Sequence, residues 1–296
     1  MPELPEVERT RLSLAPLIGR TITTVTLRRA DICDSFNALG TPHKSAPRDL
    51  LAGAKISSLT RKGKQLAIHA SDGRTLCIQL GMSGTVRLLQ PSTQDKGTQD
   101  SFPAHTHAVW FVDNYSQLLF IDPRRFGGLS TYPTESALHQ HRWSALGPDA
   151  LTITARDLAH ACEHSHRPIK SLLLDQSALA GVGNIYADES LFRAHIHPAA
   201  HASTLTKPQL TSLARAIRFI LARAIKAGGS TLRNYADSAG TAGNAQSLHA
   251  VYARANLPCT NCSHPLRGTR LAQRATVFCP ACQPPPPKPR PQMKPA

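Results

Sequence analysis

The chain of 296 residues is long enough for one large domain or several smaller ones, each with its own core. Lys and Arg number 34 and Asp and Glu 19, so the formal net charge is +15, which indicates an anionic partner and first of all nucleic acid. A hydrophobic content of 41% excludes a fully disordered chain. Because no apolar run reaches about 18 residues and the acidic N-terminus has no apolar core, we expect neither a membrane partner nor a secretory signal.

The first half of the chain has the pattern of a β-rich domain. A polar opening precedes RTRLSLAPLIG (9–19), which predicts a short amphipathic helix. Alternating, β-branched segments then predict strands separated by turns. These segments are 22–30, 55–63, 64–70, 75–81, 84–90, 107–113 and 117–122. We therefore predict an N-terminal β-sandwich or flattened barrel with one leading helix.

After Gly147-Pro148 the spacing of apolar residues becomes helical. The predicted helices cover 156–165, 169–179, 185–195 and 207–228. The fold class that follows is α+β multidomain, with a helical second half and a small cysteine-rich unit behind it. We place the divisions at 1–146, 147–256, 257–283 and 284–296, the last being a proline-rich basic tail that we expect to be disordered.

Two closely spaced cysteine pairs stand near the C-terminus, Cys259-x2-Cys262 and Cys279-x2-Cys282. Four thiolates in this arrangement can surround one Zn²⁺ tetrahedrally, and four protein ligands close the site, so we expect one structural zinc ion. The sixteen residues between the pairs suffice for a β-hairpin with a basic surface. Zinc ribbons also serve protein contacts, so this motif alone leaves DNA binding and protein binding open. The seven cysteines are too unevenly spread for a disulfide framework and indicate a reducing compartment.

The N-terminus, MPELPEVE, carries a second chemical signal. Removal of Met1 would leave Pro2 with a free secondary amine, which is less basic than a lysine side chain and so more often unprotonated. Attack of such an amine on a sugar C1′ forms an iminium directly. Glu3 beside it is a candidate to donate a proton or to stabilise the cation. Without further support, Pro2 could equally be an ordinary helix-start residue.

Six segments together resemble the bacterial formamidopyrimidine-DNA glycosylase family. They are MPELPEVE, RKGK ending at Lys64, LGMSG (80–84), DPRRFGG (122–128), GVGNIYADE (181–189) and AQRATVFCPAC (272–282). The opening favours this family over the similar endonuclease VIII group, whose members typically begin P-E-G-P. The resemblance implies a β-sandwich, a helix-two-turn-helix domain and a zinc finger, with double-stranded DNA held in the cleft between the first two.

The resemblance also implies catalytic roles. Pro2 would be the Schiff-base nucleophile, Glu3 the proton donor of base excision, and Glu6 a supporting glutamate. Lys64 matches the lysine assigned to β-elimination, and Arg274 the arginine assigned to δ-elimination.

For DNA binding, the family inserts three residues into the duplex where the damaged base leaves the stack. Met82, Arg124 and Phe126 match them, and their glycine-flanked positions favour exposed turns. Contacts to phosphates are implied for His105, Arg124, Lys170 and Asn184. Backbone N–H groups of Gly181-Val182-Gly183-Asn184 are also expected to point at a phosphate.

The chain departs from the family pattern at several positions. Gln79 stands where histidine is common, and Ser165 and His166 where lysines are expected. The stretch 240–246 resembles a lesion-covering loop but has Ala245 in place of an aromatic residue. We expect such a loop to close less firmly, so that ring-opened purines are excised well and 8-oxoguanine comparatively weakly.

The function that these observations favour is a bifunctional DNA glycosylase and abasic-site lyase. It would remove oxidised purines from duplex DNA and cleave the abasic site by β,δ-elimination, without a nucleotide cofactor. Two alternatives stay open: an oxidised-pyrimidine glycosylase of the endonuclease VIII type, and a non-catalytic protein that senses DNA damage. We expect a monomer in the bacterial cytoplasm, associated with the nucleoid.

Overall fold

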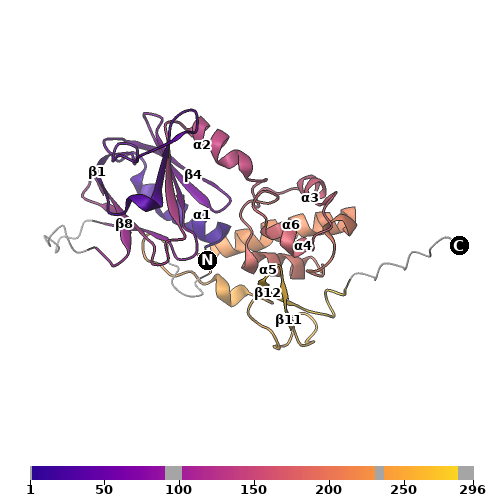
Figure 1. Cartoon of the computed structure of the whole chain (residues 1–296). Helices are drawn as coiled ribbons and strands as arrows, with labels where there is room; N and C mark the ends of the chain where they lie inside the picture. The colour runs from indigo at the N-terminus through magenta and orange to yellow at the C-terminus, as the bar shows by residue number, and fades with distance from the viewer. Residues whose placement is uncertain (1, 91–101, 231–236, 286–296) are drawn as a thin grey trace.

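The computed structural model describes residues 2–90, 102–230 and 237–285 (Figure 1). A β-rich half lies at one end of the molecule and a group of helices at the other, with the small hairpin β11–β12 below the helices. The leading helix α1 (Leu4–Ser13) lies between the strands and the helices. The α+β architecture predicted from the sequence is confirmed.

Two sheets face each other in the first half. All of their strand pairs are antiparallel except β10–β2. One sheet has the order β1 (Ile22–Leu27), β8 (Thr106–Val112), β9 (Gln117–Ile121), β7 (Thr85–Leu89). The other has the order β3 (Pro42–His43), β2 (Cys33–Phe36), β10 (Gly128–Tyr132), β6 (Thr75–Gln79), β5 (Gln65–Ala70), β4 (Ile56–Lys62). Apolar side chains from both sheets, such as Trp110 and Leu66, form one buried core, as the alternating pattern of a sandwich requires.

Helix α1 begins earlier than the sequence pattern indicates. The apolar spacing of residues 9–19 predicts a start after the polar opening, but the helix starts at Leu4 and residues Ala15–Leu17 form a separate 3₁₀ turn, η1. The side chain of Glu6 accepts a hydrogen bond from the Glu3 backbone N–H at 2.8 Å. The acidic opening is therefore the first turn of the helix, because its carboxylates satisfy backbone N–H groups that have no partner within the helix.

Among the strands and α-helices of the described residues, the sequence pattern does not predict β2, β3, β10 and helix α2 (Glu135–His141). Strand β10 contains the buried polar residues Ser130 and Thr131, which do not alternate with apolar ones. The cost of burying them is offset by hydrogen bonds from the Thr131 hydroxyl to Ser35 Oγ (2.7 Å) and from Arg142 Nη1 to Ser130 Oγ (2.8 Å). A tertiary hydrogen bond of this kind leaves no local signal.

The second half contains the four helices that the sequence predicts: α3 (Ala155–Cys162), α4 (Ile169–Leu174), α5 (Asn184–Arg193) and α6 (Lys207–Lys226). Helix α6 begins with a capping box in which Thr206 and Gln209 bind each other's backbone N–H groups. Its residues Leu213, Ile217 and Leu221 are buried in the core of this half. Of the helices in the described ranges, none has the length and apolar character that a membrane crossing requires.

The two halves are joined through the residues that frame the cleft described below. Leu4 belongs to the core of the helical half, and its N–H donates to Gly181 O at 3.1 Å. The buried Arg61 guanidinium on β4 pairs with Glu8 (2.9 Å) on α1 and with Asp149 (2.7 Å) in the helical half. The joint is therefore both apolar and ionic.

The hairpin β11 (Arg267–Leu271) and β12 (Arg274–Phe278) lies against α5. Val277 N donates to Asp188 Oδ2 on α5 at 3.1 Å. Phe192 of α5 joins a small core with Leu266 and Val277. The finger is thus attached to the helical half by both packing and a buried hydrogen bond.

Candidate active site

One cleft collects side chains that lie far apart in the sequence. Glu3, Lys64, Met82, Asn184 and Arg274 all line it. Pro2 is buried at the adjacent N-terminal turn, and residue 1 lies outside the described residues. The structure thus brings together most of the catalytic residues that the sequence analysis selects.

Glu3 sits on the N-terminal end of helix α5. Its carboxylate accepts hydrogen bonds from Gly183 N at 2.7 Å and from Ile185 N at 2.9 Å. The expectation that the backbone of residues 181–184 binds a phosphate is wrong for the Gly183 N–H, because a carboxylate of the chain already occupies it. Gly183 is required here, since a Cβ at this position would lie 2.4 Å from Glu3 Cδ.

Burial brings the two titratable groups of the cleft toward neutrality. It raises the pKa of Glu3 to about 7, against the opposing effects of the Lys64 charge and of the N–H donors. It lowers the pKa of Lys64, against the opposing charges of Glu3 and Glu6. An acid with a raised pKa and a base with a lowered pKa are suited to proton transfer.

Glu6 is the centre of a buried polar network beside the N-terminal turn. Besides the Glu3 N–H, it accepts hydrogen bonds from the Tyr186 hydroxyl and from Ser230 N, both at 2.7 Å. The Ser230 hydroxyl in turn lies 3.2 Å from the Tyr186 hydroxyl. These contacts hold the first turn of α1 against α5 and the end of the segment that follows α6.

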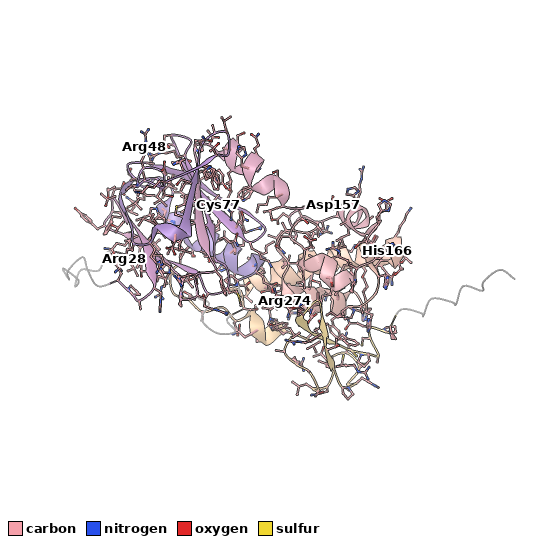
Figure 2. All side chains as sticks on the ribbon, in the orientation of Figure 1. Arg28, Arg48, Cys77, Asp157, His166 and Arg274 are labelled. Carbon is pink, nitrogen blue, oxygen red and sulfur yellow. The ribbon has the colours of Figure 1, made fainter. Side chains whose placement is uncertain are left out.

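Arg274 is held at the tip of the hairpin, on the side of the cleft (Figure 2). The preceding residues Ala272 and Gln273 have φ of 47° and 59°, as a tight hairpin turn requires. Ala275 O accepts hydrogen bonds from Asn184 Nδ2 at 3.0 Å and from Lys170 Nζ at 2.8 Å. Two side chains of the helical half therefore fix the backbone next to Arg274.

Asp122 organises the two exposed turns that carry Met82 and Phe126. One of its carboxylate oxygens accepts from Gly127 N at 2.7 Å, and the other from the Ser83 hydroxyl of the neighbouring turn. Met82 is 39% and Phe126 55% exposed, in agreement with the turns that their flanking glycines predict.

Arg124 and His105 lie close to these turns. The Arg124 guanidinium lies over the Phe126 ring, 4.9 Å from its centroid. His105 is also exposed, and its carbonyl oxygen accepts the N–H of Asp122 at 3.1 Å. An adaptable thioether, an aromatic ring, a guanidinium and an imidazole are thus presented together at one edge of the sandwich.

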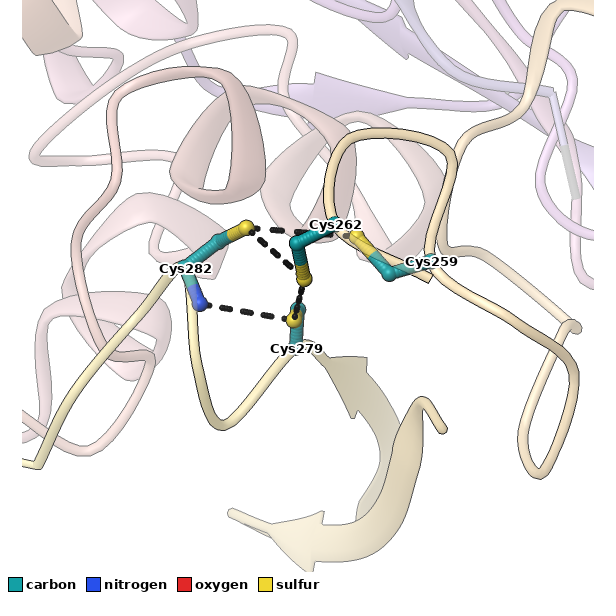
Figure 3. A group of neighbouring side chains, drawn as sticks. All are labelled: Cys259, Cys262, Cys279 and Cys282. Atoms are coloured by element: carbon teal, nitrogen blue, oxygen red, sulfur yellow. Dashed lines mark hydrogen bonds between the residues drawn. The ribbon is translucent and has the colours of Figure 1, made fainter. Parts of the chain in front are cut away.

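The four cysteines form a compact sulfur cluster (Figure 3). Sγ of Cys262 lies 3.5 Å from those of Cys279 and Cys282, and Sγ of Cys259 lies 3.9 Å from that of Cys282. Thiolates about 2.3 Å from a tetrahedral zinc ion are separated by roughly 3.8 Å, so the cluster fits this metal. All four ligands come from the protein, and the site holds a structural zinc.

Comparison with known proteins agrees with this geometry. The family descriptions "Formamidopyrimidine-DNA glycosylase N-terminal domain", "Formamidopyrimidine-DNA glycosylase H2TH domain" and "Zinc finger found in FPG and IleRS" match residues 1–129, 146–236 and 256–285. The formamidopyrimidine-DNA glycosylase of Solibacter usitatus is 42% identical, covering 96% of this chain and 99% of the relative. That of Methylobacterium radiotolerans is 37% identical, covering 96% and 100%. The chain belongs to the formamidopyrimidine-DNA glycosylase family.

Solved structures of formamidopyrimidine-DNA glycosylases share the fold. The MutM (Fpg) protein of Thermus thermophilus is 37% identical with a TM-score of 0.78, covering 95% of this chain and 98% of that one. The Lactococcus lactis Fpg in complex with DNA containing an abasic site is 30% identical with a TM-score of 0.81, covering 96% and 100%. Family membership makes this chain a DNA glycosylase of base-excision repair.

One DNA-binding residue selected for this glycosylase from the sequence is placed wrongly. Lys170 is completely buried, so it cannot contact a phosphate as the sequence analysis expects. Its ammonium pairs with Asp188 at 2.7 Å and donates to Ala275 O and Thr276 Oγ1, both at 2.8 Å. An isolated buried charge is costly, and Asp188 offsets that cost. Lys170 therefore joins α4, α5 and β12.

The structure places Ala245 in a buried turn, whereas the sequence analysis places it in a lesion-covering loop. Ala245 begins the 3₁₀ turn η5 (Ala245–Leu248), is 1% exposed and packs in the core of the helical half. Its N–H donates to Gly229 O at 3.0 Å. A residue in this position cannot act as the clamp of a lid over a flipped base. Residues 231–236 lie outside the described residues.

Sequence reasoning missed Tyr186 and Ser230 as members of this glycosylase's site. Tyr186 stands in the segment GVGNIYADE, which carries part of the family resemblance, but its type and spacing give no sign that it reaches Glu6. Ser230 lies in a stretch without regular pattern, and only the fold brings its N–H to the Glu6 carboxylate.

Proposed function

We propose that this glycosylase excises oxidised purines, both ring-opened formamidopyrimidines and 8-oxoguanine, from duplex DNA with Pro2 as the nucleophile. The observation that carries this proposal is the common cleft of Glu3, Lys64 and Arg274 beside the N-terminal turn. A variant of the Lactococcus lactis Fpg in complex with Fapy-dG containing DNA, 30% identical with a TM-score of 0.83, supports the choice of substrate.

Base excision begins at the Pro2 nitrogen, which becomes a free amine once Met1 is removed. Its lone pair forms a bond to C1′, the bond from C1′ to the base breaks, and the base leaves with the bonding electrons and takes up the proton that the Pro2 nitrogen loses. The sugar ring then opens to an iminium, and the protonated Glu3 donates its proton to the ring oxygen. A pKa of about 7 keeps much of Glu3 protonated at neutral pH.

Strand cleavage follows from the iminium, which makes the C2′ proton acidic. The neutral amine of Lys64 takes this proton, and its lowered pKa increases the fraction of neutral amine available. Loss of the 3′ phosphate is the β-elimination, and loss of the 5′ phosphate, assisted by Arg274, is the δ-elimination. The product is a gap of one nucleoside with phosphate ends.

DNA would lie across the cleft, where the +15 net charge favours its approach. Met82, Arg124 and Phe126 are the residues that we assign to the space left by the extruded base, and their exposure on adjacent turns supports this assignment. His105 and Asn184 are assigned to flanking phosphates. Asn184 has its Oδ1 buried and its Nδ2 on Ala275 O, so its phosphate contact would need a change of hydrogen bonding.

The experiment that tests the nucleophile is borohydride trapping on a duplex that contains a formamidopyrimidine. The chain with a processed N-terminus should form a covalent complex. A chain with an uncleavable N-terminal tag should bind the duplex but form no complex, because its Pro2 nitrogen is an amide. Full excision by the tagged chain would refute the mechanism.

The same experiment addresses the two alternatives. A binding protein that only senses damage would give no covalent complex with any duplex. An oxidised-pyrimidine glycosylase would be trapped faster on a pyrimidine lesion than on the purine. One observation favours testing a duplex with a pyrimidine lesion as well: a Lactococcus lactis Fpg, 29% identical with a TM-score of 0.81, is in complex with DNA containing an oxidised pyrimidine.

We further infer that the enzyme acts as a monomer in the bacterial cytoplasm, on the DNA of the nucleoid. The free cysteine thiols among the described residues support a reducing compartment. We also retain the divisions at 146/147, 256/257 and 283/284. The separate buried cores of the sandwich and of the helices support the first of these divisions.

A further inference from the structure

A chain of hydrogen bonds leads from the nucleophile's turn to a histidine of the helical half. Glu6 Oε1 accepts from the Tyr186 hydroxyl at 2.7 Å, and Tyr186 Oη lies 3.2 Å from Ser230 Oγ. Ser230 Oγ lies 3.0 Å from Nε2 of His249. The His249 ring is partly exposed and packs edge-on against the Tyr252 ring, 5.6 Å between centroids. The chain thus connects the first turn of α1 with a histidine outside the cleft.

The carboxylate end fixes the direction of every bond in this chain. Three donors face the Glu6 oxygens, namely the N–H groups of Glu3 and Ser230 and the Tyr186 hydroxyl, so Glu6 acts as an acceptor only. Tyr186 has given its single hydrogen to Glu6, so its oxygen must accept from Ser230. Ser230 has then given its own hydrogen and must accept from His249, whose Nε2 therefore carries a hydrogen.

We propose that His249 is a positioning residue for the nucleophile: its Nε2–H donates to the Ser230 hydroxyl at the far end of this chain and so helps to hold Glu6 on the N–H of Glu3, next to Pro2. The inference rests on the proposed function. Without a donor at position 249, the Ser230 oxygen loses this hydrogen bond, and the Ser230 hydroxyl that donates to Tyr186 is held less firmly. The first turn of α1 then loses part of the support that orients the amine toward C1′.

The charge of the His249 ring is not needed for this role. Glu189 and Arg223 line the same small cavity as His249, and the Arg254 guanidinium faces its carbonyl oxygen. Burial lowers the pKa of His249, against the opposing charge of Glu189. Nε2 of His249 carries a hydrogen both in the neutral ring that donates to Ser230 and in the protonated ring. The hydrogen bonds therefore keep their direction when His249 titrates. Burial also raises the pKa of Tyr186 well above its ordinary value, so Tyr186 stays a donor.

The test compares His249→Leu with His249→Gln in the full chain, by single-turnover excision and borohydride trapping on a formamidopyrimidine duplex. Leucine preserves apolar volume but cannot donate, and we expect the rate of both steps to fall about three- to tenfold, as for one lost hydrogen bond. Glutamine offers an amide N–H, and we expect it to restore the rate. The affinity for the duplex should stay unchanged in both variants, because His249 does not line the cleft.

Ser230→Ala provides a second measurement, in which the His249 side chain itself is unchanged. It should slow trapping as much as His249→Leu does, and the double variant should lose no more than the slower single variant. The pH profile of excision in His249→Gln should match that of the wild-type chain.

Three results would overturn the inference. Trapping by His249→Leu at the wild-type rate would show that the donor is unnecessary. Failure of glutamine to restore the rate would mean that the ring itself, by shape or by proton transfer, is what matters. Absence of trapping by the wild-type chain would instead refute the proposed function, and this inference with it.

Discussion

Glu3 Oε2 accepts the N–H of Gly183 at 2.7 Å, although 180 positions separate the two residues in the sequence. The carboxylate that we assign to proton donation is therefore also the N-terminal cap of helix α5. The cap fixes where the carboxyl group lies, and the burial that goes with it raises its pKa. The contact that positions the Glu3 carboxyl group thus goes together with the burial that raises its pKa.

This contact predicts the effect of Gly183→Ala. The added Cβ would lie 2.4 Å from Glu3 Cδ, so Glu3 must move away from the helix end. We expect single-turnover excision to fall at least about tenfold, because misplaced catalytic groups are costly. Gly128→Ala is the matched control, since its Cβ would meet only Ile32 O at 3.5 Å. Equal excision rates for the two variants would contradict the assignment of Glu3.

The pKa of Glu3 predicts how excision depends on pH. Burial raises it from 4.5 to about 7, and the protonated form is the one that donates. The single-turnover rate should therefore fall as the pH rises through about 7, where Glu3 loses the proton that it donates. Glu3→Gln should excise the base slowly, and its rate should not fall with pH in this way. If the fall persists in Glu3→Gln, the titrating group is not Glu3.

The buried position of Lys170 predicts a defect in stability instead of DNA contact. Lys170→Met leaves Asp188 as an uncompensated buried charge, and we expect the free energy of unfolding to drop by about 3–5 kcal/mol. Urea unfolding measures it. The salt dependence of DNA affinity should keep its slope, whereas Arg124→Ala should lower that slope by about one without loss of stability. If Lys170→Met is as stable as the wild-type chain and lowers the slope of DNA affinity against salt, Lys170 contacts a phosphate after all.

Loss of zinc should disturb the cleft through the hairpin. Cys279→Ser removes one of four ligands, so metal analysis should find far less than one zinc ion per chain. Because Arg274 is carried by the hairpin, strand cleavage should weaken together with DNA affinity. The sandwich has a separate core and should keep its β-sheet signal in circular dichroism. Full zinc content in this variant would contradict the four-cysteine site.

Much of the fold and of the site could be predicted from the sequence where the signal is local or is carried by a motif. Strand alternation, the helical spacing of α6 and the two cysteine pairs depend on neighbours within a few residues. Lys170 could not be placed in this way, because a lysine in an amphipathic helix is usually exposed and only its partner Asp188 makes burial possible. Strand β10 escaped for the same reason, since Ser35 and Arg142 satisfy its hydroxyl groups from distant segments.

The buried Arg61 joint limits how the enzyme can receive its substrate. Asp149 Oδ2 accepts not only from Arg61 but also from Gly63 N at 2.8 Å, next to Lys64. Hinge opening between the sandwich and the helices would break these bonds and move Lys64 with them. These contacts therefore restrain the opening between the sandwich and the helices, and they also position Lys64, to which we assign the β-elimination. We therefore expect the DNA duplex to adapt by kinking at the damaged base. Lesions that make the duplex easiest to bend should then be bound most readily.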